Sequence, residues 1–297
     1  MKITNLQEAK EIEIRQLQEK SFEILLYLKN FCDKYNIRFF LIGGSCIGAL
    51  RHQGFIPWDD DIDVMMLREE YERFHILWEK YGDHKNYSLC RTSKEKNYHQ
   101  PTSTFKNNNT TFINQHSKNE DINHGIYIDI GPLDYRPNSK ILRFIQAIFA
   151  MSFSLFNSQR LPNSQGKTLR LLTKIILTLI PFKNIRYYIW KYSEKQMTKY
   201  KLEECKYVSE MVIGPKAIKR LLPKEWFTKT KLLKFEGYDM PIPDGAEQWM
   251  TMAFGNYMEY PPVEERKPKH KIVLIDTENS YKKYKGKYYC VNNKKED

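Results

Sequence analysis

Four aspartates stand in five consecutive positions of the segment WDDDID. Crowded carboxylates repel one another, so a protein that keeps them usually neutralises them with a cation. Asp59, Asp61 and Asp63 recur with period two, so in an extended segment their carboxylates point to one face. The other parity holds Ile62 and Val64, which suit a core. The spacing therefore predicts a site for Mg²⁺, with Mn²⁺ as the alternative ion, at the edge of a sheet.

A further acid lies in the segment GIYIDIGPLD. Asp129 stands between Ile128 and Ile130, so on a strand its carboxylate points away from the aliphatic face. This pattern predicts Asp129 as the third metal ligand. Asp134 follows the glycine-proline pair and is expected to cap a turn or to hold a loop.

The acidic segment also has the approximate spacing of a calcium loop. Asp59, Asp61, Asp63 and Glu70 occupy the first, third, fifth and twelfth positions of an EF-hand pattern, but Val64 stands where that loop needs glycine. A solvated acidic turn is the plainer alternative. The interleaved aliphatic residues argue against it, because an exposed loop has no use for them.

A glycine pair precedes the acids. Residues 37–42 form a short β-type run that stops at Gly43 and Gly44, after which Ser45 can cap a short helix. Backbone N–H groups at such a helix N-terminus bind phosphate. A tight turn without a ligand is the alternative explanation of the two glycines.

The elements that position these residues follow from periodicity. Apolar residues at helical spacing predict a helix from a capping box at residues 4–7 to about Lys34. A second helix is expected over residues 68–81. The remaining strand predictions cover residues 61–67, 87–91, 110–113 and 126–130.

The middle of the chain is different. Residues 141–156 and 169–182 are strongly apolar with helical period, and each is shorter than a bilayer span. Core helices and helices that lie in a membrane interface both fit this pattern. The interfacial interpretation draws on the nearby cations Lys167, Arg170, Lys174, Lys183 and Arg186.

Composition sets outer limits. The 297 residues carry a formal net charge of +12, which favours an anionic partner such as nucleic acid, anionic lipid or a phosphorylated substrate. The five cysteines are scattered without a Cys-x-x-Cys pair, so a reducing cytoplasm is expected. The first 20 residues are polar and charged, and no secretion signal is expected.

Several motifs together resemble the LicD family of phosphocholine transferases, relatives of fukutin within the nucleotidyltransferase-fold superfamily. They are RHQGFIPWDDDIDV, IDIGPLDY, LPKEWF and FGNYMEYPP. The resemblance implies an α+β fold, a nucleotidyltransferase-like mixed sheet flanked by helices. It implies a discontinuous catalytic domain (residues 1–135 and 205–280), a helical insert (136–204) and a basic tail (281–297) that is expected to be loose.

The resemblance also implies a reaction: phosphocholine moves from CDP-choline to a sugar hydroxyl of a cell-wall or surface glycan precursor of the teichoic acid type, and CMP is released. Asp61 and Asp63 are then metal ligands. Asp129 is the third acid and a candidate general base, and Asp59 binds a second ion or tunes the first. Positioning and charge neutralisation supply most of the catalysis in such a transfer.

Donor-binding residues are expected among the cations and aromatics near the motifs. Gly43, Gly44 and Ser45 face the leaving phosphate, and Lys106 and His270 stand where the family pattern carries lysine and histidine. A quaternary ammonium is held by aromatic faces, for which Trp58, Tyr135, Trp249, Tyr257 and Tyr260 are candidates. The other predicted binding residues are Arg51 and His52.

The sequence leaves two further activities open. Transfer of ribitol or glycerol phosphate from another CDP-alcohol uses the same centre, and so does a nucleotidyltransferase that acts on nucleic acid. No RNA-binding motif is present, and a lipid-linked glycan suits the apolar insert better than nucleic acid does. We therefore expect a peripheral protein on the inner face of the plasma membrane, without a nucleic-acid partner.

Overall fold

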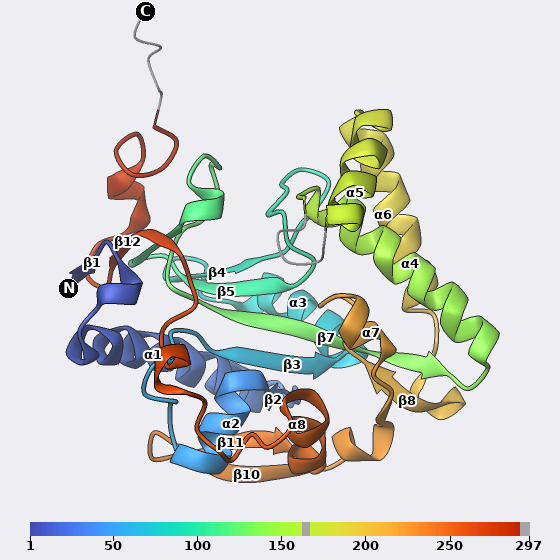
Figure 1. The fold of residues 1–297 in the computed structure, drawn as a ribbon, viewed down its shortest axis with the longest axis horizontal. Coiled ribbons are helices and arrows are strands. Elements are labelled where there is room, and N and C mark those ends of the chain that lie inside the picture. The colour runs from blue at the N-terminus through green and yellow to red at the C-terminus, as the bar shows by residue number, and fades with distance from the viewer. Residues whose placement is uncertain (162–166, 292–297) are drawn as a thin grey trace, which may run out of the picture.

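A mixed sheet forms the centre of the molecule in the computed structural model, which describes residues 1–161 and 167–291. Strand β3 runs parallel to β7, and the other neighbouring strands are antiparallel. This arrangement confirms the predicted α+β class. In spatial order the strands are β2 (Phe40–Leu41), β3 (Asp63–Leu67), β7 (Tyr127–Pro137), β5 (Ser103–Asn107) and β4 (Tyr87–Cys90) (Figure 1). Strand β8 (Cys205–Ser209) pairs with the second half of β7, and β9 (Leu222–Pro223) pairs with β8.

Two amphipathic helices cover this sheet. Helix α1 (Glu11–Lys34) packs against β5 and β7, and α3 (Arg68–Tyr81) packs against β3 and β7. The bounds of α3 confirm the prediction, and Tyr71, Phe74 and Trp78 form its buried face. Full burial of such a side chain is worth about 1.5–3 kcal/mol.

Smaller units complete the catalytic part. Helix α2 (Gly43–His52) packs between β3, the hairpin strand β10 and α8. Strands β1, β12 and β6 form a separate antiparallel sheet. The bounds of the remaining elements are β1 (Lys2–Ile3), β6 (Thr111–Asn114), β10 (Thr230–Phe235), β11 (Tyr238–Pro243), β12 (Ile272–Asp276), α7 (Pro215–Lys219), α8 (Ala246–Phe254), and the 3₁₀ turns Leu6–Glu8, Gln115–Ser117, Leu202–Glu204, Lys224–Phe227, Val263–Glu265 and Tyr281–Tyr284.

Three helices form the insert: α4 (Lys140–Ser158), α5 (Lys167–Leu179) and α6 (Lys183–Met197). Both predicted apolar helices are present. Helices α4 and α6 pack along each other at one end of the molecule (Figure 1). Phe153 of α4 and Trp190 of α6 belong to a small hydrophobic core between them. The division into domains stays a prediction.

Two details at the N-terminal ends of helices correct the sequence analysis. Asn5 caps only a 3₁₀ turn, and α1 begins at Glu11, where Glu13 accepts a hydrogen bond from the backbone of Lys10. Helix α2 already begins at Gly43, so Ser45 lies inside the helix and does not cap it.

Strands β5 and β7 also differ from the predictions. β5 was not predicted, because its polar residues lack a period-two pattern and are buried by pairing with β4 and β7. β7 continues through the glycine-proline pair to Pro137, since its second half pairs with β8. Asp134 therefore lies within β7 rather than in a turn, buried in a two-bond ion pair with Arg68.

The expectation of a loose C-terminal tail is wrong for residues 281–291. Tyr284 and Tyr289 are buried in a cluster with Ile113 and Leu274. The Tyr284 hydroxyl donates a hydrogen bond to the carboxylate of Asp276. Aromatic side chains thus fix this lysine-rich segment to the small sheet, and residues 292–297 lie outside the described part.

Candidate active site

Two aspartates lie side by side on neighbouring central strands of the sheet. Asp63 at the start of β3 is paired in register with Asp129 on β7, and both side chains line the same cavity. The backbone N–H of Asp129 donates to the carbonyl of Ile62 at 3.0 Å, which fixes this register. Period two correctly predicted which side of its own strand each of these two acids faces, whereas Asp59 and Asp61, predicted on the same extended segment as Asp63, lie before β3 begins.

The other acids lie on the loop before β3. Within the described part of the chain, Asp59, Asp60 and Asp61 are the acids whose ligand atoms converge within 4.8 Å of one another. Gln18 of α1, which is buried, donates from its side-chain nitrogen to the carbonyls of Ile56 and Asp59. This amide holds the loop in place, and sequence reasoning missed it.

The crowding of these acids changes their acidity. Burial and the neighbouring Asp61 raise the pKa of Asp59 to about 8, and the same two causes raise the pKa of Asp129 to about 7. Burial and the carboxylates of Asp61 and Asp129 raise the pKa of Asp63 well above its usual range. Carboxyl groups that repel each other in this way favour a bound cation.

The N-terminus of α2 lies beside the same acids. A Cβ atom at Gly44 would clash with the Asp59 carboxylate, and one at Gly43 would lie 3.4 Å from the Asp63 carboxylate. Gly43 also has φ +53°, a left-handed conformation that favours glycine. The glycine pair is therefore needed for close approach, and the first N–H groups of α2 lie next to the acid centre.

Ser45 has a different position from the one predicted. Its hydroxyl is buried and accepts a hydrogen bond from the backbone N–H of Asp63 at 3.1 Å. This contact ties the first turn of α2 to the start of β3. Ser45 thus positions the acid strand rather than offering a free hydroxyl.

Asp60, which was not among the predicted site residues, is the most buried acid of the loop. Its carboxylate accepts hydrogen bonds from the backbone N–H groups of Lys269 and His270 and from Nδ1 of His270 at 3.0 Å. Burial alone would lower the pKa of His270, but its bond to Asp60 and the nearby Asp61 and Asp129 raise it to about 9. His270 therefore brings a positive charge to the acid centre.

A cavity of about 290 Å³ opens from Asp63 and Asp129 toward β5, β6 and the end of α4. His270 and Lys106 line it, and Lys106 donates to the carbonyl of Asn123 and lies over the ring of Tyr127. Other lining residues include Tyr98, Gln100, Asn114, His116 and Arg160.

Besides the α2 residues Gly43, Gly44 and Ser45, the predicted binding residues Arg51, His52 and Trp58 lie outside the lining of this cavity. Arg51 donates to the carbonyls of Tyr257 and Glu259 and lies 4.7 Å from the ring of Tyr260, so it clamps the C-terminal loop. His52 accepts from Arg51 and packs edge-on against Tyr260, and Trp58 packs near the same ring.

The aromatic residues predicted to bind a choline head group are buried or already in contact with other side chains. Tyr135 and Trp249 are buried in the main core. The guanidinium of Arg266 lies 5.6 Å from the Trp58 ring and 5.2 Å from the Tyr260 ring, so these two faces already hold a cation. Tyr257 is half-buried against the same core.

Comparison with known proteins agrees with this geometry. Residues 36–140, which carry α2, both acid strands and the acidic loop, match the family model described as LicD/FKTN/FKRP, nucleotidyltransferase domain. This segment is therefore similar to the nucleotidyltransferase domain of LicD-type proteins.

Similarity to a LicD protein extends well beyond that domain. The chain is 28% identical over 269 residues to the lipopolysaccharide cholinephosphotransferase LicD of Haemophilus influenzae, an alignment that covers 88% of this chain and 97% of that protein. Two uncharacterized rickettsial proteins match shorter parts. One from Rickettsia typhi is 34% identical over 24% of this chain and 21% of its own length, and one from Rickettsia prowazekii is 29% identical over 30% and 36%.

Proposed function

We propose that this protein transfers phosphocholine from CDP-choline to a sugar hydroxyl of a surface-glycan precursor and releases CMP. The observation that carries the proposal is the pairing of Asp63 with Asp129 beside the N-terminus of α2, in a chain similar over 88% of its length to a lipopolysaccharide cholinephosphotransferase. A helix N-terminus and a pair of acids are what a diphosphate donor requires on its two sides.

The acid centre fits a divalent cation. Its donor set is made only of carboxylate oxygens, and burial together with mutual repulsion raises the pKa of Asp59, Asp63 and Asp129. We propose Asp61, Asp63 and Asp129 as the ligands of Mg²⁺ or Mn²⁺, with Asp59 in contact with a second ion or with the first. A bound ion would supply charge neutralisation at the phosphates.

Other groups of the protein would bind and orient the donor. The first N–H groups of α2 and the cationic His270 would bind the phosphate oxygens of the donor and orient them. Lys106 is buried at the cavity wall, where it interacts electrostatically with Asp129. Burial lowers the pKa of the Lys106 ammonium group. The acceptor oxygen forms a bond to the β-phosphorus while the bond from that phosphorus to the CMP oxygen breaks.

Asp129 is the proposed general base. Burial and Asp61 raise its pKa to about 7 in the absence of an ion, and a bound cation would lower it, which leaves the carboxylate ionised and able to take the proton of the acceptor hydroxyl. Asp129 lies on β7 and lines the 290 Å³ cavity. Helix α2 follows β2, which lies on the other side of β3 from β7. The acceptor would therefore approach from the cavity while the donor's phosphates lie at α2.

Two unpaired polar atoms support a hydroxyl-bearing acceptor in that cavity. Within residues 1–161 and 167–291, the buried Oδ1 of Asn114 and Nε2 of Gln100 have no hydrogen-bond partner. One is an acceptor and the other a donor, so together they suit a sugar hydroxyl. An unsatisfied buried polar group costs about 1–3 kcal/mol, which a bound sugar would offset.

Another CDP-alcohol is a second candidate donor. The faces of Trp58 and Tyr260, an aromatic pair beside the acidic loop, are occupied by Arg266. A ribitol or glycerol head group does not need such faces. The reaction and the acid centre stay the same in either case.

Donor use tests the proposal directly. The protein is incubated with Mg²⁺, extracted bacterial surface glycan and separately labelled CDP-choline, CTP or ATP, and the released nucleotide is measured. We expect CMP from CDP-choline and no turnover of CTP or ATP, with Asp63→Asn as the inactive control. Turnover of CTP or ATP instead would assign the centre to a nucleotidyltransferase.

A further inference from the structure

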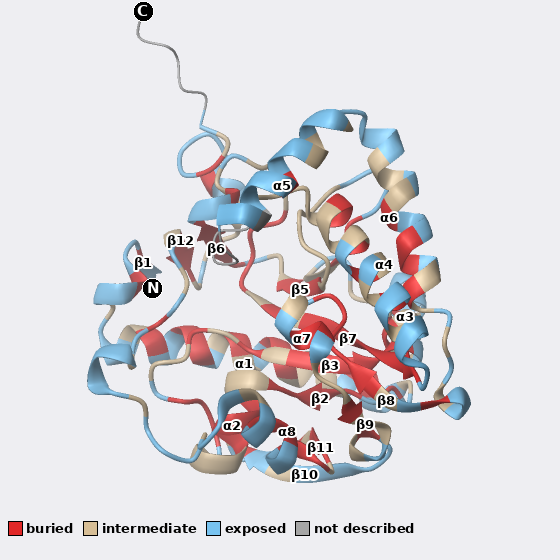
Figure 2. Ribbon diagram, turned by 45° about the vertical axis from the view of Figure 1, so that its right-hand side comes forward, coloured by how far each residue is buried: buried red, intermediate tan, exposed pale blue. Residues whose placement is uncertain are grey.

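An apolar stripe runs along the outer side of the helical insert. On α4, Ile141, Phe144, Ile148 and Met151 recur every three or four residues and are exposed, Ile141 to 73% and Phe144 to 68%. This spacing places them on one face of the helix. Figure 2 shows exposed residues along the outer sides of α4, α5 and α6.

A second stripe on α6 continues the first. Ile185, Tyr188 and Tyr192 are exposed at the same spacing. A groove of about 540 Å³ between α4 and α6 is lined by Ile148 from one helix and by these three residues from the other. We call this surface, residues 141, 144, 148, 151, 185, 188 and 192, the α4–α6 face.

The opposite side of α4 is fixed to the catalytic sheet. Gln146 is 1% exposed, donates to the carbonyls of Tyr135 and Met197, and accepts from Arg136. In the described part of the chain, α4 is the one helix long and apolar enough to cross a membrane, yet 28% of its most apolar stretch is buried inside the protein. Insertion across a bilayer would break these buried hydrogen bonds, so α4 is suited to lie on a membrane and not to span it.

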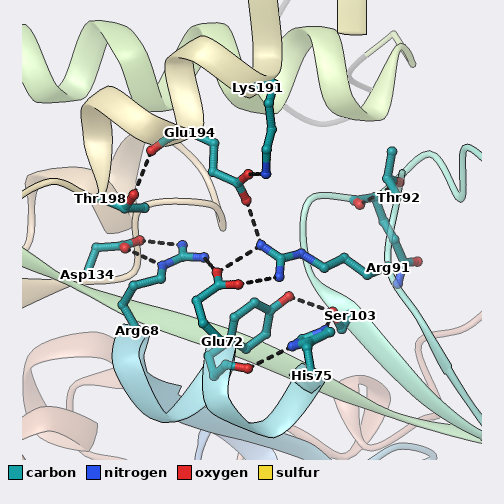
Figure 3. Close-up of polar contacts among 12 residues, drawn as sticks. Arg68, Glu72, His75, Arg91, Thr92, Ser103, Asp134, Lys191, Glu194 and Thr198 are labelled. Atoms are coloured by element: carbon teal, nitrogen blue, oxygen red, sulfur yellow. Dashed lines mark hydrogen bonds and ion pairs between the residues drawn. The ribbon is translucent and has the colours of Figure 1, made fainter. Parts of the chain in front are cut away.

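Helix α6 is anchored as firmly. Arg91 donates to Glu72 of α3 and to Glu194 of α6, at 2.7 Å for the bond to Glu194 (Figure 3). Lys191 also bonds to Glu194. The two helices therefore present the α4–α6 face as a fixed surface of the folded protein.

Helices α4, α5 and α6 carry almost only positive charges. Their only acid in the described ranges is Glu194, which is buried and paired. Against it stand nine cations, namely Lys140, Arg143, Lys167, Arg170, Lys174, Lys183, Arg186, Lys191 and Lys195. An apolar face flanked by cations is complementary to the headgroups and acyl chains of an anionic bilayer.

We propose that the α4–α6 face docks the enzyme on an anionic lipid surface, with α4 and α6 lying in the interface plane. A second copy of the chain is a poorer occupant, because a two-fold contact would bring the two sets of cations together. Anionic headgroups neutralise the same cations. Such docking would hold the cavity beside a lipid-linked acceptor at the inner face of the plasma membrane.

Vesicle flotation tests this docking without any substrate. The full chain is mixed with phosphatidylcholine vesicles that contain 30% phosphatidylglycerol, or none, at 0.1 and 0.5 M salt. Ile148→Asp/Ile185→Asp places charges in the groove, and Lys174→Glu/Lys183→Glu reverses two exposed cations. Leu232→Asp is the matched control, since Leu232 is 62% exposed on the distant hairpin strand β10.

We expect the wild type and Leu232→Asp to float with the anionic vesicles, and salt to weaken this binding without abolishing it. The groove variant should lose at least tenfold in partitioning, and the cation variant should bind weakly and with less salt dependence, while both keep the wild-type circular dichroism. The proposal is overturned if the wild type does not float, or if both double variants float as well as the control. A dimer in light scattering that the groove variant abolishes, without vesicle binding, would assign the face to a second copy.

Discussion

Nδ1 of His270 lies 3.0 Å from the carboxylate of Asp60, although the two residues are 210 positions apart in the sequence. The same carboxylate accepts the backbone N–H groups of Lys269 and His270. Asp60 therefore holds the C-terminal segment against the acidic loop, and this structural role sets it apart from its neighbour Asp61, the proposed metal ligand.

This difference predicts opposite effects of two adjacent substitutions. Asp60→Asn should lower the free energy of unfolding by about 1–3 kcal/mol, because the charge-assisted bonds of a buried carboxylate are lost. Asp61→Asn should leave stability unchanged or raise it, since the cost of burying its charge and the repulsion with Asp59 and Asp60 are removed. Urea unfolding in the presence of a chelator measures both.

A double-mutant cycle is the control for this assignment. If Asp60 and His270 act as a pair, Asp60→Asn and His270→Gln should couple by more than about 0.5 kcal/mol. Additive effects, or a destabilised Asp61→Asn, would contradict the roles given to the two acids.

The acid centre gives a second prediction. Asp61→Asn, Asp63→Asn and Asp129→Asn should each nearly abolish turnover and leave the protein folded. Magnesium should raise the Tm of the wild type, because it binds only the folded state, and should not raise the Tm of any of the three variants. An Asp63→Asn protein that keeps more than about a tenth of the activity, a loss below about 1.4 kcal/mol, would exclude Asp63 as a ligand.

A buried histidine outside the centre predicts how stability depends on pH. Nδ1 of His75 donates to the carbonyl of Tyr71, and its Nε2 accepts from the hydroxyl of Ser103 (Figure 3). Burial, with the nearby Arg91, lowers the pKa of His75 to about 4. Between that value and the unfolded pKa of about 6.5, only the unfolded chain binds the proton, so stability must fall as the pH falls through this window.

We therefore expect His75→Asn to lose less stability between pH 7 and pH 5 than the wild type, by on the order of 1–2 kcal/mol. Urea midpoints at the two pH values measure this difference. His116 and His124, whose pKa burial also lowers to about 4, are present in both proteins and cancel in the comparison. Equal losses in the two proteins would show that His75 is not held neutral.

The sequence was sufficient where a local pattern determines the structure. Period two predicted that Asp63 and Asp129 each point away from the aliphatic residues of their own strand, because alternation in a strand is a property of the backbone, and the structure adds that the two strands are neighbours. The amphipathic pattern of residues 68–81 predicted α3 with its bounds. The glycine pair likewise predicted a helix N-terminus beside the acids, although the helix begins at Gly43 and not after Ser45.

Features that depend on distant partners could not be predicted in this way. Gln18 resembles an ordinary polar residue of a helix, yet it is buried because it satisfies two loop carbonyls. Asp60 has the wrong parity for the acid face and is needed for a contact 210 residues away. Arg51 was expected at the phosphates, but the carbonyls of the C-terminal loop bind it.

The ion network between the sheet and the insert gives a fourth prediction. Arg91 bridges Glu72 and Glu194, whose side chain is 8% exposed, so Arg91→Ala leaves a buried carboxylate with only Lys191. We expect a loss of about 1.5–3 kcal/mol and faster proteolysis within α4–α6. Lys234→Ala, which removes an exposed ion pair with Asp239, is the matched control and should cost less than about 1 kcal/mol.

The identity of the donor's head group is the last prediction. Choline is a quaternary ammonium that cannot donate a hydrogen bond, so selection of choline needs aromatic faces or a carboxylate. The guanidinium of Arg266 lies 5.6 and 5.2 Å from the rings of Trp58 and Tyr260, and that of Arg51 lies 4.7 Å from the Tyr260 ring, so Arg266 is the cation that covers Trp58. Arg266→Ala should therefore strengthen the binding of CDP-choline if this pair is the choline site, and leave it unchanged if another part of the site is used.

For the wild type we predict that CDP-choline binds at least about tenfold tighter than CDP-ribitol or CDP-glycerol, a gap of about 1.4 kcal/mol. Calorimetry on the wild type with magnesium and without an acceptor compares the three donors with the metal site intact. A polyol donor would have to satisfy its hydroxyl groups with dedicated partners, each worth about 1–3 kcal/mol when lost. Equal affinities, or a preference for a polyol, would leave a phosphotransferase with the same acid centre and remove choline as its cargo.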